Sequence, residues 1–219
     1  MPFTLLAVSD RASLGEDRLP GWIGQLAAAG VDGLMLREKD LADRALYALT
    51  RLARSLFLPA SGRLLVNGRL DVALAAGADG AHLPGDGVPL AALRQRFGPR
   101  PLLGRSTHRL EEVAEARDAG ADYVVFGPVY STPGKAPGEG QGLAGLERAA
   151  AQGLPVYALG GVTLERLAEV AAAGAAGAAG IRLFQEIGRL PELVQAAAQV
   201  FPRRPGAPNA LSPGDTLQP

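Results

Sequence analysis

The sequence of 219 residues contains no cysteine and only two histidines. The absence of cysteine excludes disulfides, thiolate metal sites and a cysteine nucleophile, and it fits a reducing compartment. Lys plus Arg and Asp plus Glu number 22 each, so no excess of charge favours nucleic acid as a partner. No apolar run approaches the ~20 residues that span a bilayer, and the apolar run at residues 3–8 is too short for a signal peptide. We therefore expect a cytoplasmic protein with no nucleic-acid or membrane partner.

The sequence does contain a regular alternation of short apolar runs and amphipathic segments. Apolar runs that end in polar or small residues predict buried parallel strands at residues 3–8, 33–36, 63–66, 80–83, 101–104, 122–126, 154–159 and 176–181. Helical spacing of apolar residues predicts helices at residues 17–29, 41–56, 70–76, 88–97, 110–119, 143–151, 163–173 and 191–201. Residues 202–219 are rich in proline and glycine and have no periodicity, so we expect a disordered tail.

A short motif recurs where a helix ends and a strand begins. It reads Ala-Gly-x-Asp or Ala-Gly-Ala-Ala, and its glycines are Gly30, Gly77, Gly120 and Gly174. Each interval between them is long enough for two strand–helix units, so four copies predict eight units. Eight strands alternating with helices predict a single-domain (β/α)8 TIM barrel over residues 1–201. The alternative is an open doubly wound sheet, but the turn after the first strand has no G-x-G-x-x-G motif.

The predicted seventh strand runs directly into two glycines, Gly160 and Gly161, before a helix that opens near Thr163. Their backbone N–H groups can approach an anion closely, and a helix start adds partial positive charge. The loops after strands seven and eight are the usual phosphate site of this fold. We therefore predict a phosphate site formed by Gly160, Gly161, Gly180 and Ile181. The alternative is that Gly-Gly is only a tight turn.

Polar residues at the ends of the other predicted strands would complete the site. Cations and N–H or O–H donors suit a phosphorylated ligand, and the predicted substrate-binding residues are Arg37, Lys39, Asn67, Ser106 and Thr132. The candidates for proton transfer are His108 and Lys135. Each has a structural alternative: Arg37 and Lys39 can belong to a solvated charge run, His108 can cap a helix, and Lys135 can be a surface lysine. Lys135 lies in a loop, residues 127–142, that is long enough to be a lid.

Six segments of the sequence, in this order, resemble the thiamine phosphate synthase/TenI superfamily. They are Leu-Arg-Glu-Lys at residues 36–39, Val-Asn-Gly-Arg-Leu-Asp at 66–71, Ala-Asp-Gly-Ala-His-Leu at 78–83, Gly-Arg-Ser-Thr-His at 104–108, Phe-Gly-Pro-Val-Tyr at 126–130 and Ala-Leu-Gly-Gly-Val at 158–162. The resemblance runs from about residue 3 to residue 201. It implies a (β/α)8 barrel that binds a thiazole phosphate.

The two branches of the superfamily differ in chemistry. The synthase joins a pyrimidine pyrophosphate to a thiazole phosphate, releases pyrophosphate and uses magnesium held by two Asp residues. This sequence has Gly68 at the first of those positions and Gly87, beside Asp86, at the second. The TenI branch isomerises a carboxythiazole phosphate, and its catalytic His is replaced here by Pro128.

The resemblance favours the TenI-like branch, because the Asn-Gly-Arg and Gly-Arg-Ser-x-His segments look like that branch. We therefore predict a thiazole tautomerase that uses His108 or Lys135 and needs no cofactor. The alternatives are the synthase, which would use Mg²⁺, and a non-catalytic protein that binds a thiazole phosphate. The oligomeric state is left open.

Overall fold

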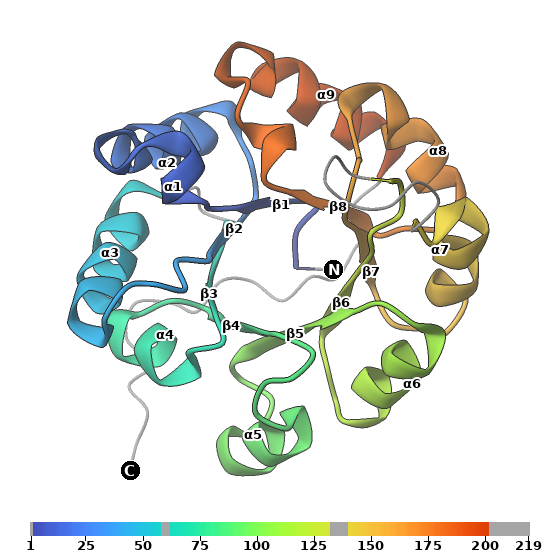
Figure 1. Cartoon of the computed structure of the whole chain (residues 1–219), viewed down its shortest axis with the longest axis horizontal. Helices are drawn as coiled ribbons and strands as arrows, with labels where there is room; N and C mark the ends of the chain where they lie inside the picture. The colour runs from blue at the N-terminus through green and yellow to red at the C-terminus, as the bar shows by residue number, and fades with distance from the viewer. Residues whose placement is uncertain (1, 58–61, 132–139, 202–219) are drawn as a thin grey trace.

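The computed structural model describes residues 2–57, 62–131 and 140–201. Eight parallel strands form a closed barrel in sequence order, and β1 pairs with β8 to close it (Figure 1). The strands are β1 Leu5–Val8, β2 Gly33–Leu36, β3 Arg63–Asn67, β4 Gly80–Leu83, β5 Leu102–Thr107, β6 Tyr123–Phe126, β7 Val156–Ala158 and β8 Gly177–Gly180. The predicted TIM barrel is thus confirmed. The predicted tail, Thr132 and Lys135 lie outside the described residues.

The helices form the outer ring (Figure 1). The α-helices are α1 Arg11–Leu14, α2 Leu19–Ala29, α3 Asp43–Leu56, α4 Leu70–Ala76, α5 Leu90–Phe97, α6 Leu110–Asp118, α7 Gly142–Ala150, α8 Leu167–Ala172 and α9 Leu190–Val200. Short 3₁₀ segments are η1 Glu16–Arg18, η2 Leu164–Arg166, η3 Arg182–Phe184 and η4 Ile187–Arg189. Within the described ranges, no helix has both the length and the apolar character needed to cross a membrane.

Two predicted boundaries are wrong in ways that affect the site. The segment before α2 contains a separate short helix, α1, that the periodicity did not predict; Asp10 caps it through the N–H of Ser13. Strand β5 continues three residues beyond its predicted end at Gly104. The extension is polar, and the Thr107 hydroxyl donates to the carbonyl of Val125. An apolar-run criterion stops too early where a strand ends in the polar mouth of a barrel.

Alternation along the strands separates the barrel interior from the layer between strands and helices. The interior cluster includes Leu6, Met35, Tyr123 and Tyr157, whereas neighbours such as Ala7 belong to the outer layer. This is the period of two expected of a strand. The rings of Tyr123 and Tyr157 meet edge to face, with centroids 5.4 Å apart. Packed aromatic rings therefore fill the interior below the mouth, and ligand access is from the C-terminal ends of the strands.

The glycines of the repeated motif have the conformation that the motif predicts. Gly30, Gly77, Gly120 and Gly174 have φ values of 86°, 79°, 84° and 84°. This left-handed conformation, which favours glycine, ends a helix and turns the chain into the next strand.

The aspartates of the motif bind the backbone of the preceding strand. Asp32 accepts from the N–H of Leu5 at 2.9 Å, Asp79 accepts from Leu64 at 2.8 Å, and Asp122 accepts from Leu103 at 2.7 Å. Each carboxylate, placed just before an even-numbered strand, therefore satisfies an N–H at or near the start of the odd-numbered strand beside it. The fourth copy has alanine at this position and keeps only the backbone bond to the preceding strand, from the N–H of Ala176 to the carbonyl of Val156, which Asp79 and Asp122 also make with Leu64 and Leu103.

Candidate active site at the barrel mouth

The acidic residue that follows β2 is buried, which corrects the alternative of a fully solvated charge run. Glu38 is only 7% exposed, and its carboxylate accepts from the Ser9 hydroxyl at 2.5 Å. The same Ser9 oxygen accepts from the backbone N–H of Arg37 at 2.9 Å. Arg11 ion-pairs with Asp40 and lies 3.7 Å from Glu38. These bonds fix the backbone on either side of Arg37 and Lys39.

Arg37 and Lys39 leave two positive charges at the mouth. The alternation that puts Met35 in the interior places Arg37 on the same side. Neither side chain has an ion-pair or hydrogen-bond partner among residues 2–57, 62–131 and 140–201. Asn67, at the end of β3, follows the interior residue Leu65 by two positions. We call these three residues, Arg37, Lys39 and Asn67, the β2–β3 arc.

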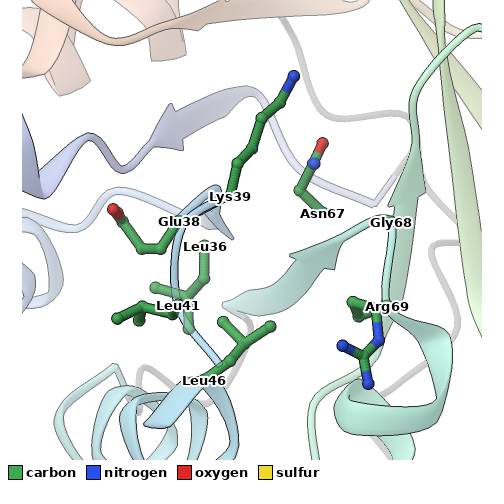
Figure 2. Close-up of a pocket in the computed structure, with 8 residues that line it drawn as sticks. All are labelled: Leu36, Glu38, Lys39, Leu41, Leu46, Asn67, Gly68 and Arg69. Carbon is green, nitrogen blue, oxygen red and sulfur yellow. The ribbon is translucent and has the colours of Figure 1, made fainter. Parts of the chain in front are cut away.

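A cavity of about 290 Å³ lies beside this arc, and its lining is Leu36, Glu38, Lys39, Leu41, Leu46, Asn67, Gly68 and Arg69. Figure 2 shows Lys39 and Asn67 extending to the same side, while Arg69 points the other way. The Arg69 guanidinium is bound by Asp71 at 2.8 Å and also by Asp43. These two carboxylates raise the pKa of Arg69 further above its ordinary value. Arg69 is therefore a structural residue, and Lys39 and Asn67 are the groups available to a ligand.

The described residues do not fit a magnesium site. Mg²⁺ takes oxygen ligands, usually carboxylates together with substrate phosphates. Gly68 offers no side chain, and a Cβ built there would have only Pro84 Cδ, at 3.8 Å, within 4 Å. Asp86 is exposed in the loop between β4 and α5. No group of three or more His, Asp or Glu side chains that could hold a metal occurs in the described part of the chain.

The Gly-Gly turn after β7 packs against the segment after β6. Gly160 and Gly161 have φ values of 92° and 64°. A Cβ on Gly160 would lie 2.6 Å from that of Pro128, and one on Gly161 would lie 2.7 Å from that of Tyr130. The N–H of Tyr130 donates to the carbonyl of Gly160 at 3.0 Å. The turn is thus a tight turn, as the structural alternative held, and its geometry also determines where its N–H groups point.

Several N–H groups at this edge have no acceptor among the described residues. Those of Gly160, Gly161 and Ile181 donate to nothing within the described residues. Gly180 is the last residue of β8 and pairs with Ala7 of β1. Arrays of unsatisfied N–H groups are typical anion sites. We call Gly160, Gly161, Gly180 and Ile181 the β7–β8 arc.

Arg166 fastens this arc to the neighbouring loop. Its guanidinium donates to the carbonyl of Gly161 at 2.6 Å and lies 4.2 Å from the centre of the Tyr130 ring. The Tyr130 hydroxyl donates to Glu169 at 2.6 Å, and burial together with this carboxylate raises the pKa of Tyr130. No sequence pattern singles out Arg166, because its role depends on a contact between two loops.

Ser106, on β5, joins a hydrogen-bonded chain that runs down into the barrel. Its Oγ lies 2.9 Å from Nε2 of His82, and Nδ1 of His82 lies 3.0 Å from the hydroxyl of Tyr123. His82 is 2% exposed, and burial lowers its pKa to about 3. His82 is therefore a satisfied, neutral residue under the mouth, and Tyr123 is a partner that was not predicted from the sequence.

His108 lies at the rim, between β5 and α6. Its ring is exposed, and Nδ1 lies 2.5 Å from the carbonyl of Gly127. Because a carbonyl only accepts hydrogen bonds, Nδ1 carries the proton and Nε2 is the basic nitrogen of the neutral ring. The helix-capping role considered for His108 is not seen, because the N-cap of α6 is Arg109 and no side chain caps it; instead the backbone N–H of His108 donates to the carboxylate of Glu112 at 2.6 Å.

Comparison with known proteins identifies the family. The family model described as thiamine monophosphate synthase matches residues 5–184. The chain belongs to this family. It is 44% identical over 174 residues to a putative thiamine-phosphate synthase of Geobacter sulfurreducens, covering 78% of this chain and 82% of that protein. It is 40% identical over 177 residues to the thiamine-phosphate synthase of Methanoculleus marisnigri, covering 80% and 83% of the two chains.

A solved family structure has the same fold. Thiamine phosphate pyrophosphorylase from Pyrococcus furiosus superposes with a TM-score of 0.81 at 27% identity, covering 91% of this chain and 97% of that one. The first two relatives are named as synthases and the third as a pyrophosphorylase, and these names give no support to the predicted assignment to the tautomerase branch.

Proposed function

We propose that this protein is a transferase of the thiamine pathway, which joins a pyrimidine pyrophosphate to a thiazole phosphate and releases pyrophosphate. The observation that carries the proposal is the 44% and 40% identity to relatives named as thiamine-phosphate synthases, each over most of both chains. The names of these relatives do not support the tautomerase activity that the sequence predicted.

The geometry of the mouth supports a reaction of two anionic substrates. The β2–β3 arc offers two unpaired cations, and the β7–β8 arc offers N–H groups with no acceptor among the described residues. Strand β1 lies between them in the barrel (Figure 1). One arc would hold the pyrophosphate and the other the phosphate of the thiazole.

In this transfer the bond between the pyrimidine group and the pyrophosphate oxygen breaks, and a bond to the thiazole forms. The pyrophosphate leaves with the bonding electrons, so negative charge grows on the oxygen that departs. Preorganised cations aimed at such an oxygen stabilise the transition state. Arg37 and Lys39 would do this, and the hydrogen bonds of Ser9 and Glu38 hold the backbone beside them in place. The β7–β8 arc would hold the thiazole phosphate and orient the ring for attack.

Variants of the two arcs test this assignment by steady-state release of pyrophosphate. Arg37→Ala should reduce kcat/KM for the pyrimidine pyrophosphate by about 10- to 100-fold, the range for a lost charge-assisted contact. The KM for the thiazole phosphate should change little. Arg44→Ala removes the same charge from an exposed position on α3 and is the matched control. Equal losses in both variants, or equal effects on both substrates, would contradict the assignment of the arcs.

Gly68 favours a second candidate, which is binding of the thiazole phosphate without transfer, with or without tautomerisation. The described residues include no group of three or more His, Asp or Glu side chains that could hold magnesium. His108 has a basic Nε2 at the rim, so it is the described candidate for a proton-transfer base. The two candidates separate in one assay: isomerisation of the carboxythiazole phosphate alone, or binding without turnover, would favour the second, and release of pyrophosphate favours the first.

A further inference from the structure

The chain of hydrogen bonds from Tyr123 through His82 to Ser106 has a direction. Tyr123 is completely buried and neutral, since burial raises the pKa of its hydroxyl well above the ordinary value. Its hydroxyl has only one described hydrogen-bond partner, Nδ1 of His82. If Nδ1 carried a proton, it would donate to the tyrosine oxygen, and the buried tyrosine proton would have no acceptor. An unsatisfied buried donor costs about 1–3 kcal/mol, so the tyrosine hydroxyl is the donor and Nδ1 is the acceptor.

The tautomer of His82 follows from this direction. A neutral imidazole with an accepting Nδ1 carries its proton on Nε2. Nε2–H then donates to Ser106 Oγ over 2.9 Å. The Tyr123 hydroxyl and both ring nitrogens of His82 are satisfied by this arrangement, whereas the reversed direction leaves the tyrosine proton without an acceptor among the described residues.

The hydroxyl proton of Ser106 is left over. No described residue accepts it. Ser106 is two residues beyond Gly104, which faces the Tyr123 ring in the interior, so its side chain shares the interior side at the mouth end of β5. Ser106 is half-buried, unlike His82 beneath it. Its proton is therefore available to a ligand in the mouth.

We infer that His82 and Tyr123 orient Ser106 so that its hydroxyl proton is presented to a hydrogen-bond acceptor of a substrate at β5. The acceptor is a heteroaromatic ring nitrogen or a phosphate oxygen. His82 and Tyr123 are positioning residues, which act through Ser106. The assignment of an acceptor to this transferase's substrate rests on the proposed function, but the tautomer does not.

The tautomer is measurable without a functional assay, because the chain contains only two histidines. Long-range ¹H–¹⁵N correlation spectra of protein labelled with ¹⁵N-histidine distinguish a protonated from an unprotonated ring nitrogen. We expect His82 as the Nε2–H form and His108 as the Nδ1–H form. His108→Gln leaves one imidazole and assigns the signals. A His82 ring found as Nδ1–H, as a mixture or as a cation at pH 7 would overturn the inference, whatever the protein catalyses.

Variants then test the donor. Ser106→Ala should weaken binding of the acceptor-bearing ligand by about 3- to 10-fold, the value of one hydrogen bond, while the His82 signal shifts but keeps the Nε2–H form. Tyr123→Phe removes the group that fixes the tautomer and should produce a mixture of the two forms with a smaller loss of affinity. His82→Gln retains an N–H near the Nε2 position and should retain most of the affinity.

Two probes distinguish the sources of the acceptor. Inorganic pyrophosphate offers only phosphate oxygens, and the pyrimidine alcohol that lacks the pyrophosphate offers only the ring and its substituents. Weaker binding of the alcohol to Ser106→Ala identifies a ring nitrogen, and weaker binding of pyrophosphate identifies a phosphate oxygen. Unchanged binding of both probes would overturn the donor role. If the protein lacked transferase activity, the spectra and the binding data would still decide the inference.

Discussion

Replacement of Gly160 by alanine tests whether the Gly-Gly turn is fixed by the loop after β6. Two costs add at this position. Its φ of 92° is disfavoured for alanine, which costs about 1–2 kcal/mol. The new Cβ would also lie 2.6 Å from Pro128 Cβ and 2.7 Å from its Cα, and such an overlap costs about 1–3 kcal/mol. We expect Gly160→Ala to lower the free energy of unfolding by about 2–5 kcal/mol.

Two further glycines separate the two costs. Gly77 has a φ of 79°, but a Cβ added there would meet nothing within 4 Å, so Gly77→Ala should lose only about 1 kcal/mol. A Cβ added at Gly24, inside α2, would also meet nothing within 4 Å. Because alanine is the better helix former, Gly24→Ala should gain about 0.5–1 kcal/mol.

The assay for this series is urea unfolding followed by circular dichroism, with the free energy extrapolated to water for each variant. From most to least stable, the expected order is Gly24→Ala, wild type, Gly77→Ala and Gly160→Ala. If Gly160→Ala were no less stable than Gly77→Ala, a Cβ at position 160 would not overlap with Pro128. The positions of the N–H groups would then not be set by the β6 loop, and the proposed geometry of the β7–β8 arc would be wrong.

Three other perturbations address the remaining parts of the site. Arg166→Ala removes the bond to the Gly161 carbonyl and should raise the KM for the thiazole phosphate by about 3- to 10-fold. The control is Arg148→Ala, on the exposed face of α7, which should leave this KM unchanged. Equal KM values in the two variants would contradict the positioning role of Arg166. Burial lowers the pKa of His82 to about 3, below the ~6.5 of histidine in an unfolded chain. As the pH drops from 7 to 5, the unfolded state therefore binds a proton that the folded state does not bind. The free energy of unfolding should fall by about 2 kcal/mol from this group. Urea unfolding at both pH values should show a smaller fall in His82→Gln, and an unchanged fall would refute this assignment. Gly68→Asp places a carboxylate beside Asn67, at a φ of 71° that aspartate tolerates better than most residues. Added Mg²⁺ should raise the Tm of this variant more than that of the wild type. Equal shifts in Tm would mean that a carboxylate at position 68 cannot reach a metal.

The barrel was predictable because each copy of the repeat has a local physical role. A glycine after a helix adopts a positive φ, as Gly30 and Gly77 do, and the aspartate two residues later binds the neighbouring strand, as Asp79 does. These interactions span one strand–helix unit, so a short motif encodes them. The Gly-Gly turn after β7 was also predictable, since glycine is the usual residue where the chain adopts a positive φ, as Gly160 and Gly161 do.

The other parts of the site depend on contacts that form only when the barrel closes. Glu38 looked like one member of a charge run, and its carboxylate is held by Ser9 and Arg11, which follow the neighbouring strand β1. Tyr123 looked like an ordinary strand residue, and its role comes from a histidine two strands away, His82. The branch of the family was predicted from two short segments, Asn-Gly-Arg at residues 67–69 and Gly-Arg-Ser-x-His at residues 104–108, and the relatives, which match over most of the chain, do not support it.

The most direct test of the proposed function is ³¹P NMR of the purified protein with both substrates. The spectrum resolves the diphosphate ester of the pyrimidine, free pyrophosphate and the phosphate monoesters in one sample. We predict that pyrophosphate appears in step with thiamine phosphate, only when both substrates are present, and more slowly with Arg37→Ala. Consumption of the carboxythiazole phosphate alone, or no formation of pyrophosphate with both substrates present at saturating concentration, would contradict the proposed transfer.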